Sequence, residues 1–225
     1  MNSICVVIPV YNEELVLSQV LEGFSQYDYM LVVVDDGSTD NTYQIAQTNN
    51  VHLLHHLFNL GQGAALQTGI SYGLLFPEVK WIVSFDSDGQ HQSSDIPKLI
   101  DVLIREKCDV VLGSRFMIGG TANNISFIRK ITLKFALFIT QVTTGLKLTD
   151  THNGLRAFTA EAAAKIYITQ NRMAHASEIL AQISRSKLKY CEVPVNVLYT
   201  RYSMAKGQSL ISGIDIILDI IRGRL

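Results

Sequence analysis

The stretch MLVVVDDGSTDNT, residues 30–42, decides the fold class of this chain. Its apolar run has no polar interruption and ends in two aspartates, after which Gly37 and several short polar residues precede an amphipathic segment. A continuous apolar run is typical of a strand buried on both faces, and short polar residues favour turns and helix starts. The stretch therefore predicts a strand, a turn and a helix of a parallel α/β sheet.

The same alternation extends in both directions along the chain. The predicted strands are Ile4–Pro9, Met30–Val34, Val51–His55, Trp81–Phe85 and Asp109–Gly113, and the predicted helices are Glu13–Ser25, Asn41–Thr48, Gln62–Leu74 and Ser94–Lys107. This pattern predicts a doubly wound, mostly parallel sheet with helices on both faces. After about residue 114 we expect helices at Ile125–Leu146 and through Glu178–Ser186, a strand at Tyr190–Val197 and an amphipathic segment at Leu210–Ile221.

Length and composition bound the class of protein. The 225 residues show no linker or internal repeat, which predicts one domain over 1–225. Hydrophobic residues make up 48% and charged residues 17%, which excludes global disorder, and a net charge of −1 argues against nucleic acid as a partner. We expect no signal peptide and no membrane-spanning helix, since no uncharged apolar stretch reaches about 20 residues.

The three cysteines, Cys5, Cys108 and Cys191, are far apart and form no Cys-x-x-Cys pair. This spacing predicts neither a zinc site nor a disulfide framework. Buried thiols in a reducing cytosol are the expectation.

Polar residues follow each predicted strand. Ligands of open α/β sheets bind outside the carboxyl ends of the strands, so these residues are the candidate site. In chain order the groups are Tyr11-Asn12-Glu13-Glu14, Asp35-Asp36-Gly37-Ser38, Asn59-Leu60-Gly61-Gln62-Gly63, Asp86-Ser87-Asp88-Gly89-Gln90 and Ser114-Arg115.

Asp86 and Asp88 form the most specific functional motif in the sequence. Two carboxylates on a turn after a buried strand can face one Mg²⁺ or Mn²⁺ ion, whose other positions phosphate oxygens and water would fill. The alternative is a helix-capping turn, because Asp, Ser and Gly are common turn residues. For Asp36 we expect a hydrogen bond to a base or ribose, the alternative again being a helix cap.

Other motifs limit the class of ligand that the site could bind. Gly61-Gln62-Gly63 lacks the third glycine of a dinucleotide fingerprint and follows the third strand, so a nicotinamide cofactor is rejected, and the chain has no P-loop motif. Arg115 and Arg129 are the candidate phosphate-binding cations. His52, His55 and His56 are interpreted as structural.

Six motifs together resemble family-two glycosyltransferases with the GT-A fold, and within them the dolichol- or polyprenol-phosphate mannosyltransferase-like enzymes. In chain order they are VVIPVYNEE (6–14), VVVDDGSTDNT (32–42), NLGQGAALQTGI (59–70), FDSDGQH (85–91), GSRF (113–116) and DTHNGLRAF (150–158). HASEIL (175–180) is similar to bacterial members.

The resemblance implies roles residue by residue. Pro9, Tyr11, Glu13 and Asp36 would hold the nucleoside of a GDP- or UDP-sugar. Asp86 and Asp88 would hold Mg²⁺ or Mn²⁺ and the diphosphate, with Ser87 and Gln90 beside them and Asp88 counted as catalytic. Arg115 and Arg129 would act on phosphates as catalytic residues, and Lys206 would contact the donor from a loop. Gln62 stands where the family usually has a lysine or arginine.

The implied reaction moves a hexose to a polyprenyl phosphate or to a glycan or other lipid-linked acceptor, in cell-envelope glycan biosynthesis. A lipid phosphate is already an anion and needs no general base, whereas a hydroxyl acceptor would need one, for which Asp150 and Glu178 are candidates. The half 1–115 would bind the nucleotide sugar and the half 116–225 the acceptor. Two other functions stay open: a metal-dependent phosphohydrolase and a non-catalytic nucleotide-sugar-binding protein.

We expect a cytoplasmic protein, with two alternatives for its apolar segments. Ile125–Leu146 and Leu210–Ile221 either pack on the sheet as core helices or lie on the inner face of the cell membrane. In the second case Arg129, Lys130 and Lys134 would meet anionic headgroups.

Overall fold

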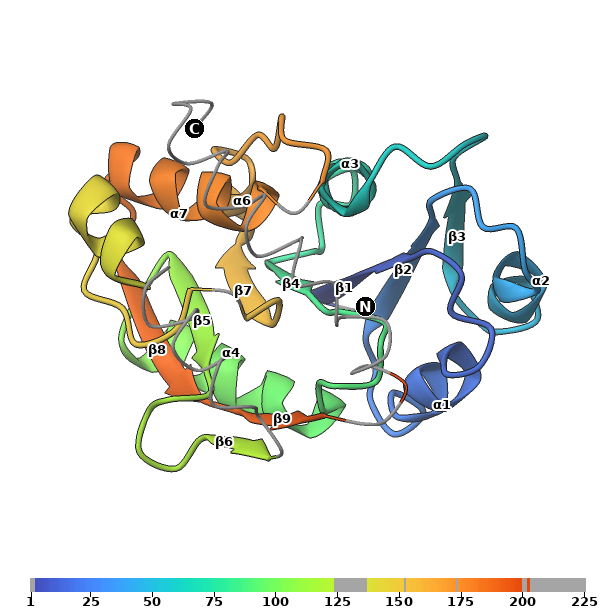
Figure 1. Ribbon diagram of the computed structural model, residues 1–225, viewed down its shortest axis with the longest axis horizontal. Helices are drawn as coiled ribbons and strands as arrows, with labels where there is room; N and C mark the ends of the chain where they lie inside the picture. The colour runs from blue at the N-terminus through green and yellow to red at the C-terminus, as the bar shows by residue number, and fades with distance from the viewer. Residues whose placement is uncertain (1–2, 124–136, 152, 173, 200–201, 203–225) are drawn as a thin grey trace.

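The computed structural model describes residues 3–123, 137–151, 153–172, 174–199 and 202. Its centre is a seven-stranded sheet with the order β3-β2-β1-β4-β7-β5-β8 (Figure 1). Strand β7 runs antiparallel to both neighbours, and the other pairs are parallel. The strands are β1 Ile4–Val10, β2 Met30–Asp35, β3 His52–His55, β4 Trp81–Ser84, β5 Val110–Ser114, β7 Arg156–Thr159 and β8 Tyr190–Pro194.

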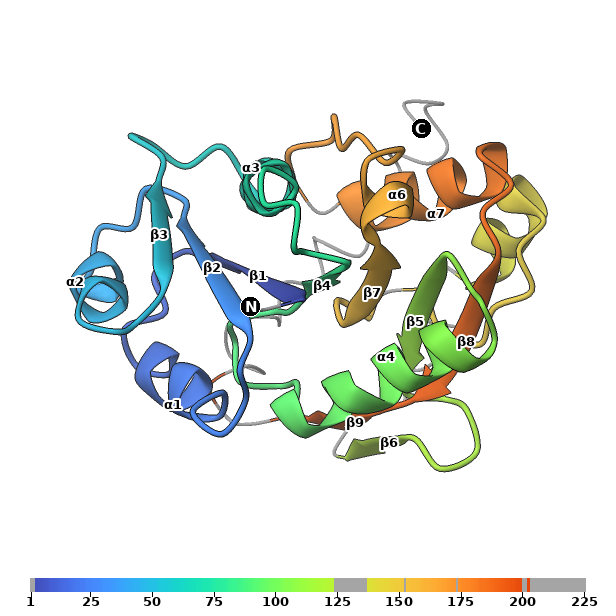
Figure 2. The same ribbon diagram turned by 180° about the vertical axis from the view of Figure 1, so that it is seen from behind.

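Helices cover both faces of this sheet, as the continuous apolar strands predict. The helices are α1 Leu17–Glu22, α2 Thr42–Gln47, α3 Gln62–Gly73, α4 Ile96–Arg105 after the 3₁₀ turn η1 Ser93–Asp95, α6 Ala160–Ala163 and α7 His175–Arg185. Successive residues of β1 point to opposite faces, with Val7 packed among residues of α3, α6 and α7 and Ile8 among residues of α1, α2 and α4. Figures 1 and 2 show α3, α6 and α7 above the sheet and α1 and α4 below it.

The five predicted strands of the first half are confirmed, and the four predicted helices are confirmed with shorter bounds. In the second half, the predicted strand Tyr190–Val197 is two strands, β8 and β9 Asn196–Leu198. The latter pairs in parallel with β6 Thr121–Asn123 to form a separate two-stranded sheet. Most of the expected helix Ile125–Leu146 and all of Leu210–Ile221 lie outside the described residues.

Strand β7 was not predicted, and it changes how the two halves of the chain meet. It inserts between β4 and β5, so Arg156 pairs with Ser84 on one side and Leu112 on the other. Four residues with a polar residue at each end give too short a pattern to mark a strand by periodicity. The consequence is that the second half of the chain enters the sheet beside the Asp86 turn.

The expectation about the cysteines is wrong for two of them. Cys108 and Cys191 form a disulfide, although 83 residues separate them in the chain. Cys108 precedes β5 and Cys191 lies in β8, and these strands are neighbours with Val111 opposite Cys191. Only this long-range pairing brings the two sulfurs together. Cys5 is a buried free thiol, as expected, and burial raises the pKa of this thiol to about 12.

Candidate active site

The Asp86–Asp88 turn lies at the carboxyl end of β4, in the middle of the sheet. Gln62, the first residue of α3, donates from Nε2 to Asp86 Oδ1 at 2.9 Å, and His91 Nε2 lies 3.3 Å from Asp86 Oδ2. Gly154 approaches so closely that a Cβ at this position would be 2.0 Å from Asp86 Oδ2. Residue 154 therefore has no room for a side chain beside the carboxylate.

The two carboxylates differ in electrostatic surroundings. Burial alone would raise the pKa of the Asp86 carboxyl, but the hydrogen bond and charge of His91 outweigh it, and this pKa lies below its ordinary value. Burial and the charge of Asp86 raise the pKa of Asp88 to about 6. Gln90 donates to both oxygens of Asp88, from its backbone nitrogen at 3.0 Å and from Nε2 at 2.8 Å. Gln90 thus orients Asp88.

The donor set fits a hard divalent cation. Burial is the larger cause of the raised pKa of Asp88 and the charge of Asp86 is the second, and a bound cation would remove the repulsion between the two carboxylates. Within the described ranges, no three His, Cys, Asp or Glu side chains are grouped as a metal cage. Magnesium and manganese are commonly held by one or two carboxylates together with substrate phosphates, so Asp86 and Asp88 suffice on the protein side.

The glycine motif brings two helices together at the site. Gly61 has φ 107°, a conformation that favours glycine. A Cβ at Gly63 would lie 2.1 Å from the carbonyl oxygen of Gln170, and the Gly63 nitrogen donates to Asn171 O at 2.7 Å. The start of α3 therefore packs directly on the segment that leads into α7. The motif serves close packing, in agreement with the rejected dinucleotide interpretation.

Asp36 has contacts within the protein that the sequence did not predict. Its buried carboxylate accepts hydrogen bonds from the backbone nitrogens of Leu60 (3.0 Å) and Gly61 (2.7 Å), and His56 Nδ1 lies at 2.7 Å. His56 Nε2 in turn lies 3.0 Å from Thr68 Oγ1. The carboxylate thus holds the loop before α3, and it caps no helix. His55 pairs with Asp35 in the same way at 2.7 Å, so both histidines have the structural role predicted.

Arg115 is buried in an ion pair. Its Nε and one terminal nitrogen donate to the two oxygens of Asp150 at 2.7 and 2.8 Å, and the other terminal nitrogen donates to the Tyr199 hydroxyl at 2.7 Å. Burial alone would lower the pKa of this guanidinium, but the contacts with Asp150 and Tyr199 outweigh it and raise it. Each side-chain nitrogen of Arg115 therefore has a protein partner, and these three bonds use three of the five N–H groups of the guanidinium.

The other predicted donor residues line the same region. Pro9, near the end of β1, lines the pocket described below, and its carbonyl oxygen accepts from Ser87 Oγ at 2.9 Å. Glu13 is buried, and its carboxylate accepts from the Tyr202 hydroxyl at 2.7 Å. Tyr11 is partly exposed. Arg129 and Lys206 lie outside the described residues.

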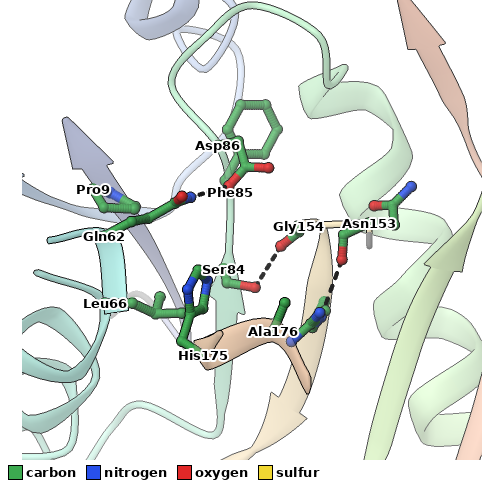
Figure 3. Close-up of a pocket in the computed structure, with 11 residues that line it drawn as sticks. Pro9, Gln62, Leu66, Ser84, Phe85, Asp86, Asn153, Gly154, His175 and Ala176 are labelled. Carbon is green, nitrogen blue, oxygen red and sulfur yellow. Dashed lines mark hydrogen bonds between the residues drawn. The ribbon is translucent and has the colours of Figure 1, made fainter. Parts of the chain in front are cut away.

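A pocket opens next to Asp86, between the ends of β1 and β4 and the start of α7 (Figure 3). Its polar lining includes Arg156 and His175, which are not among the predicted site residues. Both lie in the quoted motifs DTHNGLRAF and HASEIL, which were the available signal. Their position became visible only through β7 and α7, because nothing in the local sequence places either residue beside Asp86.

Comparisons with known proteins agree with this geometry. The sequence model of glycosyl transferase family 2 matches residues 5–167. The UDP-N-acetylglucosamine--dolichyl-phosphate N-acetylglucosaminyltransferase of Methanococcus voltae is 33% identical over 95% of this chain and 92% of its own length. The polyprenol monophosphomannose synthase of Mycolicibacterium smegmatis is 32% identical over 72% of this chain and 63% of its own.

A solved structure with a similar fold is glucosyl-3-phosphoglycerate synthase from Mycobacterium tuberculosis in complex with Mn²⁺, UDP and glucosyl-3-phosphoglycerate. The TM-score is 0.70 at 18% identity, and the match covers 97% of this chain and 80% of that one. This likeness confirms the predicted GT-A fold.

The fold and the strand-end site define a glycosyltransferase of the GT-A type. The chain belongs to glycosyl transferase family 2. This membership decides for the glycosyltransferase interpretation over the phosphohydrolase.

Proposed function

We propose that this protein transfers a hexose from a nucleoside-diphosphate sugar to a polyprenyl phosphate, with Asp86 and Asp88 holding a divalent cation. The names of the two relatives support the lipid-phosphate acceptor, and the solved neighbour's Mn²⁺ and UDP support the cofactor and the donor class. The experiment below determines which nucleoside the donor carries, which sugar is transferred and which metal is used.

The assignment of a phosphate acceptor rests on the hydrogen bonds of the two candidate general bases, Asp150 and Glu178. Asp150 is paired with Arg115 through both oxygens. Glu178 accepts from the backbone nitrogens of Thr169 and Gln170 at 3.0 and 2.8 Å and from the Thr169 hydroxyl at 2.6 Å. Neither carboxylate is poised to deprotonate a sugar hydroxyl. A phosphate acceptor is already ionised, so this arrangement suits it.

The reaction then needs no proton transfer. An oxygen of the acceptor phosphate attacks the anomeric carbon, the bond from that carbon to the diphosphate oxygen breaks, and the nucleoside diphosphate leaves with the electron pair. When bound, the cation stabilises the negative charge that grows on this leaving group. Asp86 and Asp88 would hold it, while Gln90 keeps Asp88 in place.

Contact with the membrane follows from a lipid-linked acceptor. None of the helices in the described part of the chain has the length and apolar character that a membrane crossing requires. Because the proposed acceptor is lipid-linked, we propose peripheral association with the cytoplasmic leaflet. The division into a donor-binding half 1–115 and an acceptor-side half 116–225 is likewise a proposal, with the pocket drawing on both halves.

The test is release of free nucleoside diphosphate from UDP-glucose, UDP-N-acetylglucosamine or GDP-mannose, with Mn²⁺ or Mg²⁺. Release that requires a short-chain polyprenyl phosphate supports the proposal. Release with a polyprenol or a free sugar but not with the phosphate would refute the acceptor assignment. Hydrolysis that is independent of any acceptor, or tight donor binding without release under every condition, would refute sugar transfer.

A further inference from the structure

The disulfide between Cys108 and Cys191 joins two layers of the fold. Cys191 lies in β8, the last strand of the seven-stranded sheet, which in the described part of the chain pairs with β5 alone. Cys108 follows α4, and its backbone nitrogen donates to Leu103 O at 3.1 Å, which fixes it to the last turn of this helix. The disulfide therefore anchors an edge strand to the helix layer below the sheet, in addition to the pairing of that strand with β5.

The residue next to Cys191 connects β8 to the candidate active site. Neighbouring residues of a strand point to opposite faces, so Cys191 packs on the cluster that includes α4 while Glu192 faces the other side of the sheet. Both carboxylate oxygens of Glu192 accept from the backbone nitrogen of Thr149, at 2.9 and 3.0 Å, and one accepts from the nitrogen of Asp150 at 3.3 Å. Asp150 is the partner of Arg115. Glu192 thus holds the segment that presents Asp150 to Arg115.

The continuation of β8 contacts the turn that carries Asp88. β8 leads directly into β9 (Figure 1), and the backbone nitrogen of Leu198 in β9 donates to Gln90 O at 2.9 Å. Gln90 in turn orients Asp88 through two hydrogen bonds. The positions of both Glu192 and Leu198 depend on where β8 lies. A bond that fixes β8 therefore supports two groups of the candidate active site from one side.

The two cysteines of the disulfide differ in their access to solvent. Cys108 is buried, whereas Cys191 is partly exposed, so a thiol from solvent reaches the sulfur of Cys191 first. At the cytoplasmic leaflet proposed above, the bond would face the thiols of a reducing compartment. Disulfides of cytosolic proteins are usually transient, and they are often redox-sensing. Exchange with small dithiols is the chemistry that this location offers to the pair.

We propose that the Cys108–Cys191 disulfide is a redox-sensitive cross-link whose reduction loosens β8 and β9 and thereby lowers the activity of the site. The effect on activity rests on the proposed function, whereas the loosening of the two strands does not. An edge strand has hydrogen-bond partners on one side only, so a covalent anchor has a larger effect there than on a central strand.

The exchange proceeds in two steps. A thiolate of a dithiol reductant attacks the sulfur of Cys191 and forms a mixed disulfide, while the sulfur of Cys108 leaves with the electron pair of the broken bond and takes up a proton. The second thiol of the reductant then displaces the sulfur of Cys191, which is also protonated. The two cysteines gain two electrons and two protons, and the reductant becomes a disulfide. A disulfide oxidant reverses both steps.

The experiment compares the wild-type protein after treatment with reduced or with oxidised dithiothreitol, with mass spectrometry to verify the state of each cysteine. Hydrogen exchange of residues 190–198 reports on β8 and β9, and release of nucleoside diphosphate in the presence of a polyprenyl phosphate reports on the site. After reduction, we expect exchange in this segment to become faster by about tenfold or more, because the cross-link no longer opposes local opening. Turnover should fall by roughly 2- to 13-fold, the equivalent of one net hydrogen bond, and reoxidation should restore both values.

Two variants test whether the response belongs to this pair of cysteines. Cys191→Ser keeps a side chain of similar size that cannot form the bond, so it should show the fast exchange and low turnover of the reduced protein and should respond to neither reagent. Cys5→Ala removes the buried free thiol and should keep the full redox response. A response that persists in Cys191→Ser or is lost in Cys5→Ala contradicts the proposal. The two states of the wild-type protein need no variant, so the comparison holds even if Cys191→Ser does not fold.

The two readouts separate this proposal from the proposed function. If the bond resists dithiothreitol in the folded protein, or if its reduction leaves exchange or turnover unchanged, the proposal is wrong although the proposed function stands. If neither redox state releases nucleoside diphosphate from any donor, the proposed function is wrong. The exchange of residues 190–198 then still decides whether the disulfide controls β8 and β9.

Discussion

Removing the Asp36 carboxylate tests whether this residue holds the loop or the nucleoside. The structure gives the carboxylate three internal partners, the nitrogens of Leu60 and Gly61 and the ring of His56. Asp36→Ala leaves all three without their acceptor in a buried place. Each hydrogen bond to a charged group contributes about 1.5–3 kcal/mol, but bonds that share one carboxylate are not additive. We expect the free energy of unfolding to fall by about 3–5 kcal/mol, the range for breaking a buried charged contact.

The measurement is urea unfolding followed by fluorescence of Trp81, the single tryptophan of the chain. In a separate thermal unfolding experiment, the same loss should lower the melting temperature of a domain of this size by roughly 6–20 °C, at about 2–4 °C for each kcal/mol. Asp101→Ala is the matched control. Asp101 pairs with Arg105 at 3.2 Å on the surface, where such pairs contribute about 0–1 kcal/mol.

A double-mutant cycle with His56→Ala sharpens this test. If the two side chains form one unit, the double variant should be less destabilised than the sum of the single variants. The reasoning is refuted if Asp36→Ala keeps its stability within about 1 kcal/mol. If its affinity for nucleoside diphosphate then falls tenfold or more, the carboxylate is a direct contact to the nucleoside, as the sequence predicts.

Four further predictions follow from other parts of the structure. Asp88→Asn should leave the melting temperature within a few degrees of wild type but abolish the Mn²⁺-dependent part of nucleoside diphosphate binding in calorimetry; metal-dependent affinity that survives would remove Asp88 from the metal site. Gly63→Ala should destabilise by about 1–3 kcal/mol through overlap with Gln170, whereas Gly23→Ala, where a Cβ would be 3.2 Å from its nearest neighbour, should cost far less in the same urea assay. Glu178→Gln should retain a turnover number within about one order of magnitude, because its oxygens hold residues 169 and 170; a drop of about 10²–10⁴-fold, the usual contribution of a general base, would restore it as the base. Flotation with anionic liposomes should carry the protein upward at low salt, and both added salt and Arg129→Ala with Lys130→Ala should reduce this; a protein that stays at the bottom at low salt contradicts the membrane proposal.

The local sequence pattern was enough to predict the strands and helices of the first half of the chain and the two candidate metal ligands. The strands β1, β2, β4 and β5 are runs of apolar residues buried on both faces, and this property is visible without knowing their partners. Asp86 and Asp88 follow such a run directly. Because parallel strands end at one edge of the sheet, their position at the site follows from the pattern alone.

Only the tertiary structure decided which distant groups meet there. The insertion of β7 between β4 and β5 brings Arg156 to the pocket, and the pairing of β5 with β8 joins Cys108 to Cys191. It also encloses Arg115 with Asp150 and Tyr199, two partners that the sequence pattern does not reveal. Periodicity and turn chemistry are properties of a few consecutive residues, whereas the neighbours of a strand depend on how the whole sheet packs. The sequence therefore determined that this chain forms a mostly parallel α/β sheet with a candidate site at the strand ends. Packing determined which side chains line the pocket at that site.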